Sequence, residues 1–200
     1  MYNTLSEVLN INNRVSFSEK CLPVQSELSI LIRDCIAKSP SAQKKLYDLF
    51  APAAYGVIKR YLYNDEFAAQ EVLNDSFYKI LTKLDQYNFQ GVFEGWIRRI
   101  VVNTVTDHLR KNIKESKANK EVQEEDAFIN SESVERLSHK ELLNIVQTIP
   151  DAQRAVFNLY VFENYSHKEI ATLLNLTESN SRWYLNDARR RLKEKINFIL

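Results

Sequence analysis

Hydrophobic residues recur three or four positions apart along most of the chain, as they do on the buried face of an α-helix. Leu46, Phe50, Ala53 and Val57 illustrate the spacing in one segment. Ser39, Pro40 and Ser41 interrupt the pattern, as expected between two helices. The pattern predicts helices over residues 28–38, 42–62, 66–84, 93–112, 138–149, 151–163, 166–175 and 177–200.

Glycine and proline are scarce, with three and four copies in 200 residues, which favours an all-α fold with few tight turns. The stretch 115–135 carries seven acidic side chains and two lysines and has little periodicity. A segment this polar cannot bury enough apolar surface to fold alone, so it predicts a linker. We therefore expect two small helical domains: a mobile extension at 1–26, a first domain at 27–113, an acidic linker at 114–137 and a second domain at 138–200.

Candidate chemistry is sparse. The net charge is +1, and the chain has no apolar run near 18 residues and no basic leader followed by an apolar segment, so we expect a cytoplasmic protein without membrane insertion. Cys21 and Cys35 are expected to be free thiols. His108, His139 and His167 lack a second ligand at metal-binding spacing. No metal, cofactor or catalytic activity is predicted, since no catalytic or phosphate-cradling motif is present.

The segment 93–112 predicts an amphipathic helix with an unusual outer face. At about 100° per residue, the predicted buried stripe contains Ile97, Ile100, Val101, Thr104 and His108. The opposite stripe contains Arg99, Asn103, Thr106 and Arg110. Residues 96–114 hold five basic side chains against one acid, whereas a merely solvated face usually mixes its signs. From this helix alone, the basic face is either simply solvated or binds an acidic partner.

The end of the chain predicts a helix-turn-helix. Ser166 with Glu169 fits a capping box, and Thr177 is a second plausible N-cap. The last helix is predicted to bury Ser181, Leu185, Ala188 and Leu192. Its opposite face carries Ser179, Trp183, Asn186 and Arg190. Residues 182–195 hold six basic and two acidic side chains, a local field suited to phosphate.

Two interpretations of Trp183 stay open from the residues alone. The ring either packs on a neighbouring helix or a partner chain, or it contacts DNA beside hydrogen-bonding residues of a recognition helix. Two basic, hydrogen-bonding faces on separate segments favour nucleic acid. From the residues alone, a helix-turn-helix transcriptional regulator and a helical adaptor that binds only polypeptide both stay open.

Three stretches carry a resemblance to a known family. The stretch "FEGWIRRIVVNTVTDHLRK" at 93–111 resembles the F-x-x-W-[LI]-x-R-I-x-x-N-x-x-x-D-x-L-R signature of sigma-70 family factors of the extracytoplasmic-function (ECF) group. "EVLNDSFYKI" at 71–80 is similar to the preceding helix of that domain. Residues 149–196 are similar to the family's C-terminal helix-turn-helix. Asn164, Asn175 and Ser179 stand where the family usually has glycine, and asparagine tolerates the left-handed backbone of such turns.

The resemblance implies an alternative sigma factor that binds core RNA polymerase and promoter DNA. It implies that Glu71, Asn74 and Asp75 dock on the β′ clamp helices of the polymerase, and that the β flap is a further contact of the core. It implies that the minus-ten element is melted and held by Tyr87, Asn88, Phe89, Trp96, Arg98, Arg99, Asn103, Thr106 and Arg110. It implies that the minus-35 element is contacted by Ser179, Asn180, Arg182, Trp183, Asn186, Arg189 and Arg190. An anti-sigma factor is a further implied partner.

Overall fold

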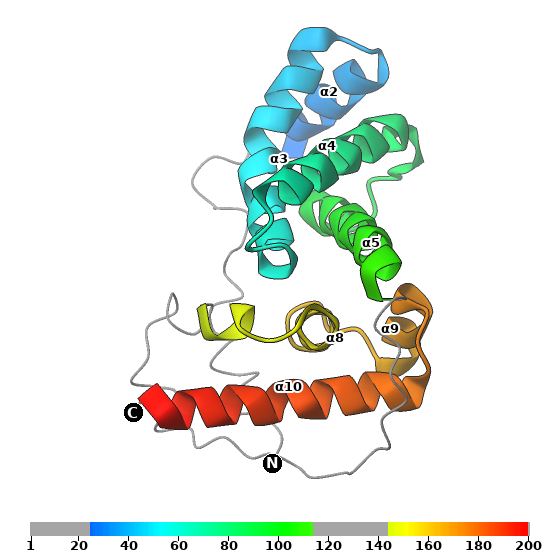
Figure 1. Ribbon diagram of the computed structural model, residues 1–200. Coiled ribbons are helices and arrows are strands. Elements are labelled where there is room, and N and C mark those ends of the chain that lie inside the picture. The colour runs from blue at the N-terminus through cyan, green and yellow to red at the C-terminus, as the bar shows by residue number, and fades with distance from the viewer. Residues whose placement is uncertain (1–24, 114–143, 200) are drawn as a thin grey trace. The chain divides into compact units, whose positions relative to one another are not determined.

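The computed structural model describes residues 25–113 and 144–199, and every regular element in these ranges is a helix (Figure 1). The extension up to residue 24, the linker at 114–137, Cys21 and His139 lie outside the described residues. The chain divides into two compact units, and the division falls inside a helix, between Val105 and Thr106. Each unit is described by itself.

The first unit contains α2 (Gln25–Ile36), α3 (Pro40–Tyr61), α4 (Glu66–Thr82), the 3-10 turn η1 (Leu84–Gln86) and most of α5 (Phe93–Ile113). α3 packs against both α2 and α4. Tyr47 and Phe77 join α3 to α4 with ring centroids 4.6 Å apart. Phe50 and Phe93 join α3 to α5 edge to face at 5.4 Å.

Local sequence explains where these helices begin. Ser39 precedes Pro40, whose fixed φ suits the first turn of α3. Asp65 caps α4, because its carboxylate accepts a hydrogen bond from the Ala68 amide at 2.8 Å. Cys35 is a buried free thiol in α2, as predicted for this cysteine.

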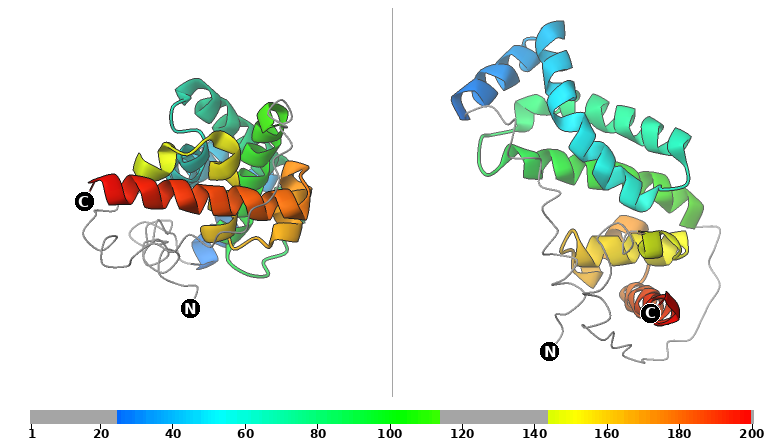
Figure 2. Two further views of the ribbon diagram at one scale, coloured as in Figure 1. Left: turned by 60° about the horizontal axis from the view of Figure 1, so that its bottom comes forward. Right: turned by 90° about the vertical axis from the view of Figure 1, so that its left-hand side faces the viewer.

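The second unit contains α8 (Asp151–Val161), α9 (His167–Leu174) and α10 (Glu178–Ile199). α10 packs against both shorter helices, and the right-hand view of Figure 2 looks almost along it. Val156, Phe157 and Leu159 of α8 are completely buried. Apolar packing of α8 and α9 on one side of α10 therefore leaves the other side of this helix available for contacts.

The turns on both sides of α9 contain the predicted left-handed asparagines. Asn164 has φ 56° and Asn175 has φ 53°. The predicted capping box is present: the Ser166 hydroxyl accepts from the Glu169 amide, and the Ser166 amide donates to the Glu169 carboxylate at 2.8 Å. The Thr177 hydroxyl accepts from the Asn180 amide at 3.1 Å, which confirms Thr177 as the cap of α10. The helix-turn-helix predicted from sequence is formed by α9 and α10.

Candidate functional site

One face of α4 is exposed and combines acidic, amide and aromatic side chains. Glu71, Asn74 and Asp75 are all exposed, while their neighbours Val72 and Phe77 are buried. Phe67 and Tyr78 lie on the same face and are 83% and 71% exposed. At about 100° per residue these five side chains fall within one arc of the helix. Neither aromatic residue was predicted as part of a site, although their spacing from Glu71 and Asn74 in the sequence places them on this face.

The start of α4 is joined to α3 by side chains. The Tyr55 hydroxyl donates to Glu66, and the Lys59 ammonium lies 3.0 Å from the other oxygen of that carboxylate. Lys59 also donates to the Tyr63 carbonyl at 2.6 Å. The hydrogen bond to Glu66 raises the pKa of Tyr55 to about 12, and the same bond together with Lys59 lowers the pKa of Glu66. These contacts fix the end of α4 that carries Phe67.

The connector before α5 is built around Tyr87, which is buried, contrary to its expected place on the DNA-facing side. Its hydroxyl donates to the Gly91 carbonyl at 2.9 Å. Its ring packs with Phe93 at 4.9 Å and Trp96 at 5.6 Å. Burial, followed by the charge of Glu94, raises the pKa of Tyr87. The tyrosine therefore shapes the connector from inside.

Two other predicted residues of the connector are exposed. Asn88 is at the surface, and its side-chain oxygen accepts from the Gln90 amide at 3.1 Å. Phe89 is 47% exposed and has φ 60°, while Gly91 has φ 84°. A left-handed backbone is uncommon for a bulky residue such as phenylalanine. The loop thus holds one aromatic ring and one amide outward over the Tyr87 core.

The outer face of α5 differs from the predicted stripe at one position. Arg99 is exposed, and Asn103 and Arg110 are half-buried, whereas Thr106 is completely buried. The burial arises because α5 buries a face broader than one stripe. Val102, Val105 and Leu109 are all 1% exposed or less and lie between Thr106 and the predicted core positions. The prediction for Thr106 was therefore wrong as to exposure.

The remaining predicted positions of α5 are partly covered. Trp96 and Arg98 are half-buried. Ile100 and His108, expected in the core, are half-buried as well. Arg110 forms an ion pair with Asp107. The basic character of this face therefore includes one arginine whose charge is partly balanced by its own helix.

On α10 the predicted buried stripe is confirmed. Ser181, Leu185, Ala188 and Leu192 are all 2% exposed or less. Of the predicted contact residues, those that are exposed are Ser179, Asn180, Arg182 and Arg190. Those that are half-buried are Trp183, Asn186 and Arg189. Trp183 packs edge to face on Tyr184 at 5.2 Å, so part of its ring is covered within the helix and part is available.

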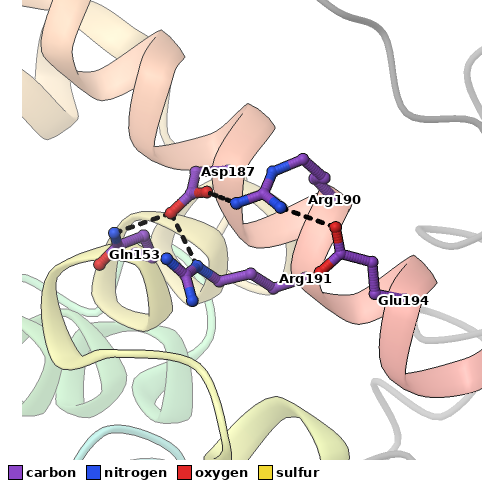
Figure 3. A network of polar contacts seen from close by, with 5 residues as sticks. All are labelled: Gln153, Asp187, Arg190, Arg191 and Glu194. Atoms are coloured by element: carbon purple, nitrogen blue, oxygen red, sulfur yellow. Dashed lines mark hydrogen bonds and ion pairs between the residues drawn. The ribbon is translucent and has the colours of Figure 1, made fainter. Parts of the chain in front are cut away.

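Three arginines of α10 form ion pairs with acidic side chains, and a count of charges does not show this pairing (Figure 3). Arg190 lies 2.6 Å from Asp187 and 2.7 Å from Glu194. Arg191 lies 2.9 Å from Asp187. Arg182 pairs with Glu178. Burial alone would raise the pKa of Asp187, but hydrogen bonds from Arg191, Arg190 and Gln153 outweigh it, so the pKa is lowered.

His167 connects α9 to the neighbouring helices. Its Nδ1 lies 3.0 Å from the Ser181 hydroxyl of α10, and its ring stacks on Tyr160 of α8 at 4.7 Å. The guanidinium of Arg189 lies over the Tyr160 ring, 5.8 Å from its centre. From the sequence, His167 was described only as a histidine without a second metal ligand. The contacts with Tyr160 and Ser181 were not predicted, because they join residues distant in sequence.

Within 25–113 and 144–199, no three His, Cys, Asp or Glu side chains gather into a group that could hold a metal ion. No helix in the same ranges is both long and apolar enough to cross a membrane.

Known proteins match this chain over both units. Family models for "Sigma-70 region 2" and "Sigma-70, region 4" match residues 46–115 and 139–192, together more than half of the chain. The ECF RNA polymerase sigma factor SigM of Bacillus subtilis is 28% identical over 66% of this chain and 82% of its own length. The RNA polymerase sigma-H factor of Pseudomonas aeruginosa is 24% identical over 78% of this chain and 89% of its own.

Solved structures are similar as well. CnrH, in complex with the cytosolic domain of CnrY, matches 84% of this chain and 96% of its own, at 17% identity and a TM-score of 0.44. The sigma factor RpoE of Bartonella quintana, in complex with the anti-sigma factor NepR, matches 77% of this chain and 96% of its own, at 19% identity and a TM-score of 0.45.

A helix-turn-helix whose second helix has Arg182 and Arg190 exposed is typical of a DNA-binding protein. The family models and the named relatives make the class specific: the chain belongs to the sigma-70 family, in its ECF group. It is a sigma factor that directs transcription initiation.

Proposed function

We propose that three surfaces divide the work of this sigma factor. The exposed face of α4 binds the β′ clamp helices of core RNA polymerase. The connector and the outer face of α5 open and hold the minus-ten element. The outer face of α10 contacts the minus-35 element as duplex DNA, and the second unit also meets the β flap.

The observation that carries this proposal is the composition of the α4 face. Phe67 and Tyr78 leave large aromatic surfaces in water on either side of Glu71, Asn74 and Asp75. Exposed aromatic groups rimmed by polar residues mark protein-binding sites. A regulator that acts without polymerase has no need of this face, and an adaptor that binds only polypeptide has no need of basic faces on both α5 and α10.

The minus-ten assignment is supported by the side chains that the connector and α5 expose. Phe89 offers a ring on which an unstacked base can stack, and the exposed Asn88 and the half-buried Asn103 carry amides of the kind that bind base edges. Arg99 adds an exposed positive charge near them in sequence. Tyr87 and Thr106 are left out of the direct contacts because both are buried. They keep a role in shaping the loop and the helix.

The test is abortive transcription from a promoter library with core RNA polymerase and the full chain. We expect promoter-specific products that core polymerase alone does not make. A chain that binds particular duplexes without polymerase and yields no such products would be an ordinary regulator. A chain that binds polymerase without selecting any promoter would be an adaptor. An anti-sigma partner remains a prediction, which affinity capture of the chain from its host would address.

A further inference from the structure

Two consecutive arginines of α10 differ in how many of their donors the protein already uses (Figure 3). Arg190 donates from one terminal nitrogen to Asp187 at 2.6 Å and from the other to Glu194 at 2.7 Å. Arg191 donates to Asp187 only through Nε, at 2.9 Å. Among the described residues, neither terminal nitrogen of Arg191 has a hydrogen-bond partner.

Accessibility does not separate these arginines. The side chain of Arg190 is 47% exposed and that of Arg191 is 42% exposed. What differs is the free hydrogen-bonding capacity. A guanidinium group binds phosphate best when two parallel N–H donors face it. Within the described part of the chain, both terminal nitrogens of Arg191 are free to form such a pair, whereas each terminal nitrogen of Arg190 already donates to Asp187 or Glu194, so Arg190 has fewer donors left for a phosphate.

The shared acceptor is itself fixed. Asp187 is 8% exposed, and its Oδ2 accepts from the Gln153 amide of α8 at 2.9 Å as well as from Arg191. Because the carboxylate is tied to α8, it cannot follow the arginines outward. It therefore holds the guanidinium of Arg191 at a set place on the helix. Positioning of this kind removes part of the entropy cost of fixing a long side chain on DNA.

We infer that Arg191 is a phosphate-binding residue of the α10 contact with duplex DNA, and that Asp187 is its positioning residue. The inference rests on the proposed function of α10. It assigns the phosphate contact to a residue that the helical-wheel argument passed over, since the stripe opposite the core contains Arg190. Arg190 then serves mainly to balance Asp187 and Glu194.

The experiment uses the full chain with core RNA polymerase and a promoter selected from the library by the wild-type protein. Half-saturation of promoter binding is measured against salt concentration for Arg191→Gln, Arg190→Gln and the charge-matched control Lys195→Gln. Each phosphate contact contributes about 0.9 to the slope of log affinity against log salt. We expect Arg191→Gln to lower this slope by about that amount, Arg190→Gln to lower it by less, and Lys195→Gln to leave it nearly unchanged. An equal loss with Arg190→Gln, or none beyond the control with Arg191→Gln, overturns the inference.

Asp187→Asn tests positioning by the sign of its effect. Removal of a negative charge near DNA would by itself tighten binding, because it makes the local field more positive. Positioning predicts the opposite, a several-fold weaker affinity for the selected promoter. Gln153→Ala keeps every charge and removes only the link to α8, so it should weaken binding in the same direction even if Asp187→Asn fails to fold. Tighter binding by Asp187→Asn, or no change with Gln153→Ala, refutes the positioning role.

The proposed function and the assignment of Arg191 can fail separately. If the wild-type chain selects no promoter with core polymerase, the proposed function is wrong and the inference falls with it. If it selects promoters but the slopes of the arginine variants do not differ, only the assignment of Arg191 is wrong.

Discussion

His167 is the titratable residue on which the packing of the helix-turn-helix depends most directly. It lies between Tyr160 and Ser181, and burial, then the positive charge of Arg182, then that of Arg189 lower its pKa, while Glu178 opposes them. In the unfolded chain the imidazole returns to its ordinary pKa near 6.5. The unfolded state then binds more protons than the folded state as pH falls below that value.

The first prediction follows from this sign. The contribution of His167 to stability is fully present above the ordinary pKa and declines as pH falls toward the lowered pKa of the folded state. We expect the free energy of unfolding to fall more between about pH 7.5 and about pH 5.5 in the wild-type chain than in His167→Gln. Only the wild-type chain has an imidazole at position 167 that gains a proton in this range. Urea unfolding at both pH values gives the comparison. Equal losses in the two proteins would contradict the prediction.

Residue patterns predicted burial only where the surroundings are simple. The α10 stripe of Ser181 and Leu185 followed from angle alone, because one side of this helix packs on α8 and α9. The prediction that Thr106 is exposed was wrong because α5 buries a face too broad for a single stripe. The prediction that Tyr87 faces DNA was wrong because the sequence does not distinguish an aromatic residue that points out of a polar loop from one that supports the loop from inside. The Asp187 network was hidden because Gln153 comes from another helix.

At the scale of elements, the turns around α9 depend on asparagines in left-handed conformation. Asn175 ends α9 with φ 53°, its amide donates to the Ala171 carbonyl, and its side chain is exposed. An alanine in this conformation costs about 1–2 kcal/mol, whereas glycine has no such cost. The backbone of this turn therefore limits which residues can stand at position 175.

The second prediction uses that difference. Asn175→Ala should lower the free energy of unfolding by about 1 kcal/mol, while Asn175→Gly should leave it nearly unchanged. Asn180→Ala makes the same exchange at an exposed helical position and serves as the control, with little expected loss. Chemical denaturation of the four proteins measures the differences. If alanine at 175 proved as harmless as glycine, the left-handed turn would not be a constraint on the sequence.

The features best predicted from the sequence were the residues at which helices begin and the faces that helices bury. Ser166, Glu169 and Thr177 gave the starts of α9 and α10 because caps act within a few residues. The link from Lys59 and Tyr55 to Glu66 could not be predicted, since it depends on how α3 and α4 pack. The exposed aromatics Phe67 and Tyr78 could have been found by extending the α4 wheel beyond its polar positions.

For the whole molecule, the arrangement of charge matters more than its sum. The net charge of +1 gives no general attraction to DNA, so we expect the affinity for DNA to come from local groups such as Arg99 and Arg191. The proposed polymerase face on α4 and the proposed DNA face on α5 belong to different helices. Two faces on separate helices should be separable by mutation.

The last prediction is a competition between wild-type and variant chains for a limited amount of core polymerase. Arg99→Ala with Asn103→Ala alters only the proposed DNA face, so this variant should still occupy polymerase but form few open complexes. Mixed in excess with wild-type protein, it should suppress promoter-specific transcripts.

Glu71→Lys with Asp75→Lys is the matched counterpart, because it alters two exposed positions on the proposed polymerase face and leaves α5 intact. Opposite charge at a binding surface weakens the correct partner and slows its encounter. This variant should be inactive and yet fail to suppress the wild-type protein at the same excess. Suppression by the α4 variant, or none by the α5 variant, would mean that the two faces are assigned to the wrong partners, because only a chain that binds polymerase can exclude another from it.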